Sequence, residues 1–163
     1  MVKPDAILLL AQMTIELIAT LTITVGSIVL FAYWFRYTCL LILSAKTARD
    51  YTSDVAYSNK LGFPQVQAQL AQGSTPDLDR LRAALDRDYQ VVRQLLKYMP
   101  KAEEGPSPLE TQMLAINYRL MGTWYQVIRQ FSGTAAAQAL GEMSMVVAHF
   151  ANLMGEQAAG AAA

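Results

Sequence analysis

The hydrophobic positions divide the chain into one continuous apolar block and, after residue 46, shorter segments with a helical period. Residues 17–35 contain no charged residue and no proline, and Arg36 follows at once. These nineteen residues would span roughly 28 Å as a helix, close to the hydrocarbon thickness of a bilayer, about 30 Å. We therefore predict a single N-terminal transmembrane helix.

Aromatic side chains gather at the C-terminal end of this block. Tyr and Trp are enriched where a span meets the lipid headgroups. The predicted anchors at the membrane interface are Tyr33, Trp34, Arg36 and Tyr37.

Basic residues near the span set the expected orientation. Lys3 precedes the span, whereas Arg36, Lys46 and Arg49 follow it. The positive-inside rule then places the N-terminus outside the cell (inner) membrane and the C-terminal domain in the cytoplasm. A cleaved signal peptide is disfavoured, because the apolar region far exceeds the usual length of about 7–15 residues and no small-residue cleavage site ends it.

The apolar region is longer than one span needs. Residues 6–45 carry only two charges, Glu16 and Arg36, and would cover roughly 60 Å as a helix. Tilt cannot absorb a twofold excess. We therefore expect the flanks, residues 7–10 and 40–43, to be buried against another protein.

One face of the predicted span is polar. Glu16, Thr20, Thr24 and Ser27 fall within about 80° of one another at 100° per residue. Small and hydroxyl residues of this kind form helix–helix contacts in membranes, so we predict that this face meets a partner helix. The alternative is that the hydroxyl groups bond back to carbonyls of their own helix.

Nothing in the sequence interrupts the first helix until Gly62 and Pro64. We expect one helix of about 55 residues that continues beyond the membrane, with Gly62 in a left-handed C-terminal cap. After Arg36 a heptad-like seam of small residues follows, which indicates packing within a bundle. Its members are Leu41, Ser44, Ala48, Tyr51, Val55 and Ser58.

The rest of the chain predicts a small helical bundle. Residues 63–73 are long enough for two helical turns. A helix is expected from a cap at Ser74 or Thr75, with Pro76 in its first turn, to Met99. Residues 101–108 have the composition of a loop, and Ser107 and Glu110 form a capping box at the next helix start.

That next helix repeats apolar residues at spacings of four and three, which predicts one buried face. The face comprises Leu109, Met113, Ile116, Leu120, Trp124, Val127 and Phe131. A break at residues 132–134 and a last helix over about 135–154 follow. The expected fold is therefore all-α: residues 1–45 as the transmembrane helix with apolar flanks, 46–154 as the bundle, and 155–163 as a low-complexity Ala/Gly tail.

Composition excludes several function classes. The chain has 13 basic and 13 acidic residues, so no broad basic surface for nucleic acid is expected. The single cysteine, Cys39, excludes an intramolecular disulfide, and the single histidine, His149, cannot form a metal site alone. No phosphate-binding loop or nucleophile motif occurs. We expect no enzyme, no cofactor of its own and no small-molecule substrate.

These observations favour a non-catalytic accessory or structural subunit that docks on a larger integral-membrane core subunit. Respiratory and photosynthetic complexes carry such single-span subunits, and lipids or pigments of the partner could then contact the chain. The alternative is a self-associating single-span scaffold or tether. A sensor is disfavoured because no sensory domain precedes the span.

Overall fold

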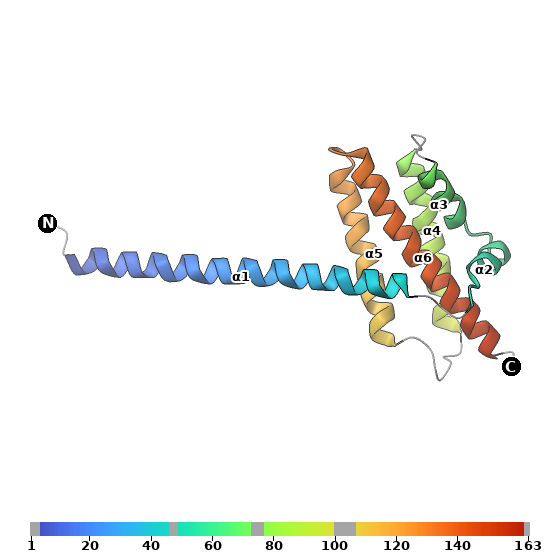
Figure 1. Cartoon of the computed structure of the whole chain (residues 1–163), viewed down its shortest axis with the longest axis horizontal. Helices are drawn as coiled ribbons and strands as arrows, with labels where there is room; N and C mark the ends of the chain where they lie inside the picture. The colour runs from blue at the N-terminus through green and yellow to red at the C-terminus, as the bar shows by residue number, and fades with distance from the viewer. Residues whose placement is uncertain (1–3, 46–48, 73–76, 100–106, 162–163) are drawn as a thin grey trace. The chain divides into compact units, whose positions relative to one another are not determined.

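The computed structural model describes residues 4–45, 49–72, 77–99 and 107–161 of the 163-residue chain, apart from the side chains of residues 4–11 and 161. These residues form six helices and no strand, which confirms the all-α prediction (Figure 1). They fall into two compact units, Met1–Leu40 and Leu41–Ala163, and we call the second unit the helical domain. The helices are α1 (Pro4–Ser44), α2 (Thr52–Ser58), α3 (Phe63–Ala71), α4 (Leu78–Tyr98), α5 (Pro108–Ile128) and α6 (Gly133–Ala161).

Helix α1 is the one helix in the described residues that is long and apolar enough to cross a membrane. The candidate span covers Gln12–Ser44, and none of its most apolar stretch is buried. Ile15, Leu21 and Leu30 are each more than 60% exposed. An apolar surface of this size is suited to lipid and not to water.

The first helix is shorter than predicted, because it ends at Ser44 and does not continue to residue 61. The backbone N–H of Thr52 donates to Oδ1 of Asp50 at 2.9 Å, and the N–H of Tyr51 donates to Oδ1 of Asn152 on α6 at 2.8 Å. These bonds give α2 a start of its own against α6. The predicted seam from Leu41 to Ser58 is therefore divided between two helices, and its Ala48 lies outside the described residues.

The turn after α2 also differs from the prediction. Lys60, not Gly62, has the left-handed conformation, with φ of 52°. The N–H of Leu61 bonds to the carbonyl of Ala56 at 2.9 Å, as in a Schellman cap. Gly62 has φ of −94° and instead forms the N-cap of α3, with Pro64 in the first turn of that helix. The predicted two turns over residues 63–73 are confirmed as α3.

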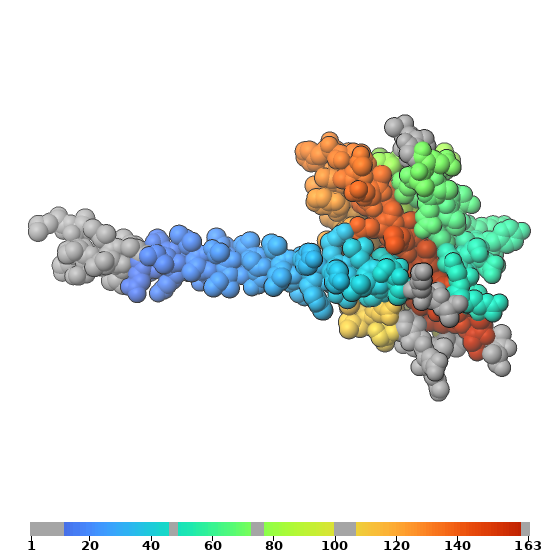
Figure 2. All heavy atoms as spheres, viewed as in Figure 1, coloured from blue at the N-terminus to red at the C-terminus, as the bar shows by residue number. Residues whose placement is uncertain are grey.

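Helix α6 is the centre of the helical domain. It packs against α2, α3, α4 and α5, and in Figure 1 it lies alongside α4 and α5. Figure 2 shows the side chains of α3, in green, lying against those of α6, in orange to red. The side chains of α6 that are at most 1% exposed are Ala136, Leu140, Met143, Ser144, Val146, Val147, Phe150 and Ala151.

The last helix continues beyond the predicted end at residue 154, so residues 155–161 of the expected tail are helical. Gly155 allows α6 to pack against the start of α2. A Cβ atom on Gly155 would lie 2.2 Å from Cβ of Tyr51 and 3.3 Å from Cγ2 of Val55. The absence of a side chain lets α6 extend directly beneath the start of α2.

The helix caps in the domain follow the sequence signals in part. The Ser107 hydroxyl accepts the N–H of Glu110 at 3.1 Å, which confirms the predicted cap of α5. Helix α4 is capped by Asp77, whose carboxylate accepts the N–H of Arg80 at 3.2 Å. The predicted Ser74, Thr75 and Pro76, like most of the 101–108 loop, lie outside the described residues.

Candidate interaction surfaces and pockets

The polar face predicted on the span bonds to its own helix. The hydroxyls of Thr20, Thr24 and Ser27 each donate to the carbonyl four residues earlier, at 2.8 Å. Together with Glu16 these residues are exposed. The hydroxyl oxygens still have lone pairs that can accept a bond from another helix. Contact with a partner helix therefore stays a prediction.

The predicted interface anchors lie along the last third of α1. Tyr33 and Tyr37 stack one turn apart, with ring centroids 6.5 Å apart. Tyr33, Trp34 and Tyr37 are each more than half exposed, while Arg36 is partly covered. Their position at headgroup level is a prediction that follows from residue type and place in the helix.

The predicted buried face of α5 is wrong, because most of it is exposed. Its large side chains are from 45% to 79% exposed, and Met113 alone is partly covered. We call the exposed residues the α5 stripe. They are Leu109, Ile116, Leu120, Trp124, Val127 and Phe131.

Helix α5 instead buries a face that lies about 120° around the helix axis from the stripe, at 100° per residue. The residues on that face are Leu114, Asn117, Tyr118, Met121 and Tyr125. The two tyrosines explain this choice. Tyr118 donates its hydroxyl to Oδ1 of Asp86 at 2.8 Å, and Tyr125 donates to Oδ1 of Asp79 at 2.9 Å. Their rings pack in the core while their hydroxyls bond to α4.

An arginine reinforces the contact between α4 and α5. The Arg82 guanidinium donates to Oδ2 of Asp86 at 3.3 Å and to the carbonyl of Gly122, and lies 5.2 Å from the Tyr125 ring centroid. A Cβ on Gly122 would lie 3.0 Å from Nη2 of Arg82. Burial, together with the bond to Asp86, raises the pKa of Tyr118, so this hydroxyl keeps its proton.

A cleft of about 360 Å³ lies between α4 and α5. Tyr89 and Tyr118 line it with stacked rings whose centroids are 3.9 Å apart. Arg119 lines the same cleft. The Tyr89 hydroxyl is buried and has no hydrogen-bond partner among the described residues. This site was not predicted from the sequence, because neither tyrosine belongs to an apolar stripe or a known motif.

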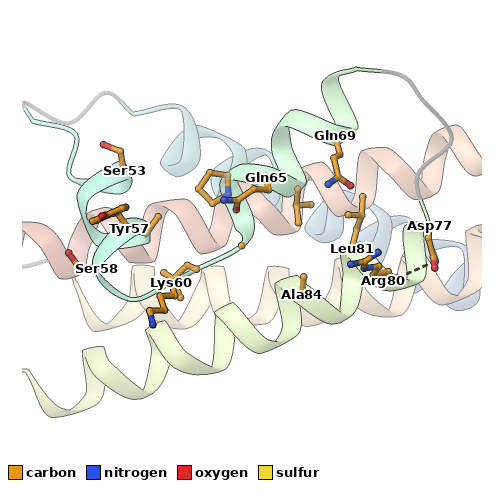
Figure 3. A pocket seen from close by; sticks show the side chains of 15 residues that line it. Ser53, Tyr57, Ser58, Lys60, Gln65, Gln69, Asp77, Arg80, Leu81 and Ala84 are labelled. Carbon is orange, nitrogen blue, oxygen red and sulfur yellow. Dashed lines mark hydrogen bonds between the residues drawn. The ribbon is translucent and has the colours of Figure 1, made fainter.

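A wider groove of about 1080 Å³ lies among α2, α3 and α4 (Figure 3). Leu61, Val66 and Leu81 form its apolar floor, and polar side chains surround it in Figure 3. These polar residues, Tyr57, Lys60, Gln65, Gln69 and Arg80, are all exposed. The groove is therefore open, and its polar groups are solvated and not held in one geometry.

Asp88 is a buried carboxylate between α4 and the turn before α3. Its Oδ2 accepts the N–H of Gly62 at 2.6 Å, and its Oδ1 lies 3.5 Å from Nη2 of Arg87. Asp88 thus holds the N-terminus of α3, where a negative charge is favoured. The sequence signal for this role is the interruption of the apolar face of α4 by one acidic residue.

The single histidine lies in the domain and has one acidic neighbour. Nε2 of His149 is 3.5 Å from Oε1 of Glu110, and 13% of the side chain is exposed. Burial lowers the pKa of His149, while Glu110 and Glu156 oppose that shift. Within the described residues, no group of three or more His, Cys, Asp or Glu side chains is placed to hold a metal ion.

Comparison of the chain with protein-family models, with curated proteins and with solved structures found no match.

Proposed function

We propose that this protein is a non-catalytic, membrane-anchored subunit that docks on a larger membrane protein complex. The observation that carries the proposal is the α5 stripe, in which five large apolar side chains are exposed on one face of α5 and Phe131 is exposed in the turn that follows. Exposed rows of this kind on a soluble surface are typical of protein interaction sites.

The shape of the stripe favours another helix as its occupant. Within α5 it extends from Leu109 to Val127, or about 27 Å at 1.5 Å per residue, and is one helix face wide. An apolar stripe of this form packs against the groove of a partner helix. We therefore propose that a helix of the core subunit covers it.

Pairing of two copies of the chain is less well supported. Within α5 the stripe, with Met113, repeats at spacings of 4, 3, 4, 4 and 3, or about 3.6 residues per turn, whereas a left-handed coiled coil needs 3.5. The heptad-like seam that would support self-association also ends, because α1 stops at Ser44. A self-associating scaffold is therefore the alternative, and native gel separation distinguishes it from an accessory subunit.

Helix α1 supplies the second part of the proposal. Its length and composition suit a single span, and its polar face of Glu16, Thr20, Thr24 and Ser27 would meet the same core subunit. The distribution of basic residues would place the helical domain in the cytoplasm, at the cell (inner) membrane. Respiratory and photosynthetic complexes are the classes of assembly that we propose first.

The test is extraction of the native membrane with mild detergent, followed by native gel separation and mass spectrometry. We expect the chain to migrate with a large complex of fixed composition. A chain that migrates alone would overturn the proposal, and one that migrates only with itself would establish the scaffold in its place.

Two matched variants test whether the α5 stripe makes the contact with the core subunit. Leu120→Glu places a charge on the stripe, whereas Gln112→Glu places the same charge at an exposed position off the stripe. We expect only Leu120→Glu to lose co-migration, with both variants keeping the melting temperature of the wild type. Thr24→Leu tests α1 in the same way, since unchanged co-purification would argue against its polar face.

A further inference from the structure

Donor groups without an acceptor converge in the cleft between α4 and α5. Tyr89 is only 7% exposed, and its hydroxyl is a buried group that makes no hydrogen bond with the described residues. A buried hydroxyl without a partner is unfavourable, and few such groups occur in folded proteins. The Tyr89 side chain also lines a cleft of about 360 Å³, so a molecule bound in that cleft is the candidate for the missing acceptor.

Two cationic side chains lie beside this hydroxyl. Arg119 lines the cleft, and the guanidinium carbon of Arg93 is 6.0 Å from the centroid of the Tyr89 ring. Neither arginine forms an ion pair with any carboxylate in the described part of the chain. A guanidinium only donates hydrogen bonds, so neither arginine can accept one from the phenol.

The nearby carboxylate does not serve as the missing acceptor. Asp86 also lines the cleft, but its Oδ1 accepts the Tyr118 hydroxyl and its Oδ2 accepts Nε of Arg82. Burial raises the pKa of Tyr89, against the opposing effect of Arg93 and Arg119, so its phenol stays protonated at neutral pH. The cleft is therefore lined by Tyr89 and by the guanidinium of Arg119, and Arg93 lies beside the Tyr89 ring at its edge.

We propose that the cleft between α4 and α5 binds an oxyanion of the phosphate class through the Tyr89 hydroxyl, Arg93 and Arg119. A phosphate oxygen would accept the unpaired O–H bond, and its charge would be held by the two arginines, which match phosphate geometry well. The cleft is near the lower end of the usual range for small-ligand sites, about 300–1,000 Å³. The phosphate could be a free ion or the headgroup of an anionic lipid.

The test is thermal unfolding of the full chain in nonionic detergent micelles. One series contains rising sodium phosphate, with ionic strength held constant by sodium chloride, and a second contains micelles doped with phosphatidic acid or with phosphatidylcholine. We expect the melting temperature to rise with the oxyanion. A rise with inorganic phosphate identifies a free ion, whereas a rise with phosphatidic acid alone identifies a lipid headgroup.

Variants show whether the rise comes from this cleft. Arg93→Gln and Arg119→Gln should each weaken the apparent affinity about tenfold or more. Arg80→Gln, a change at an exposed arginine of α4 that lines the other groove, should leave it unchanged. All three positions are exposed, so the variants should fold.

Tyr89→Phe separates ligand binding from a structural role. The change removes the unpaired hydroxyl but keeps the ring that stacks on Tyr118. Without an oxyanion the variant should melt at or above the temperature of the wild type, yet its response to the oxyanion should be lost. The proposal is overturned if neither probe raises the melting temperature, or if the rise is the same in the wild type and in these variants. It does not depend on whether α1 spans a membrane.

Discussion

At the scale of single residues, a few polar side chains in the core hold the short helices of the domain in place. Asp88 is fully buried and joins α4 to the N-terminus of α3 through the N–H of Gly62. The bond is charge-assisted, and it holds a turn in which the preceding Lys60 adopts an unfavourable left-handed conformation. Buried contacts of this kind therefore determine a turn that glycine placement alone does not predict.

Replacement of Asp88 by alanine should destabilise the helical domain by about 2–3 kcal/mol, because the N–H of Gly62 would lose its acceptor in a buried site. The measurement is the free energy of unfolding from urea titration. Asp88→Asn, which keeps an acceptor oxygen but not the charge, should cost less. Asp54→Ala, at an exposed acidic position in α2, is the control. Equal effects at positions 54 and 88 would contradict the role of Asp88.

His149 predicts a pH dependence of stability. Burial lowers the pKa of His149 in the folded protein below its unfolded value of 6.5. As the pH falls below 6.5, the unfolded chain therefore binds a proton at position 149 more readily than the folded protein does, and the free energy of unfolding decreases. This decrease continues down to the lower pKa of the folded state, and above about pH 7 His149 has no effect. His149→Gln should remove this part of the slope between pH 7.5 and 5.5, measured by urea unfolding. A wild type that gains stability on acidification relative to the variant would show that pairing with Glu110 outweighs burial.

At the scale of the helices, close approach between α2 and α6 depends on one glycine. A methyl group on Gly155 would overlap Cβ of Tyr51, an atom that no side-chain rotation can move. Gly141, in the same helix, has no heavy atom within 4 Å of the corresponding position. An alanine at position 155 therefore tests packing, whereas an alanine at position 141 tests helix propensity alone.

We expect Gly155→Ala to destabilise the domain by about 1–3 kcal/mol through overpacking. Gly141→Ala should stabilise it by up to about 1 kcal/mol, since alanine is the better helix former. Urea unfolding gives both values, and hydrogen exchange of the α2 amides shows whether α2 is the part released. Stabilisation by Gly155→Ala would mean that α2 is not held closely against α6.

The helices themselves could largely be predicted from sequence, but their orientation in the domain could not. Ser107 predicts the start of α5 correctly, because a cap is a local signal. The end was predicted less well, since α5 ends at Ile128 and not after Phe131, and α6 already begins at Gly133. The period of Leu120 and Trp124 correctly indicates a helix yet assigns the wrong side to the core. Periodicity does not distinguish a face buried within the chain from one reserved for another protein.

The candidate oxyanion site also could not be predicted from the sequence. Tyr89 and Tyr118 are 29 positions apart in the sequence and come together only when α4 and α5 pack on α6. Local patterns along the chain do not indicate this pairing or its proximity to Arg119. By contrast, the apolar block of α1 is contiguous in the sequence and predicts one candidate span, although the end of the helix at Ser44 was not predicted.

At the scale of the whole molecule, the two units have opposite surfaces. Helix α1 exposes mostly apolar side chains over residues 12–34, whereas the helical domain has a packed core and a largely polar surface interrupted by the α5 stripe. A single chain with these two parts is stable in water only if α1 enters a bilayer or is covered by other protein.

Membrane insertion of α1 predicts the behaviour of a double substitution in its middle. Leu21→Lys with Ile28→Lys should prevent insertion, because each charge near the centre of a span costs about 2.5–3.5 kcal/mol. Washing the membrane fraction with sodium carbonate should then release this variant while the wild type stays in the pellet. The control adds the same two charges at Tyr57 and Tyr98, which are 89% and 75% exposed in the helical domain, and should remain in the pellet. Release of the wild type by carbonate would show that α1 is covered by protein and not by lipid. Retention of the variant with lysines at positions 21 and 28, together with its control, would show that contacts outside α1 hold the chain in the membrane fraction.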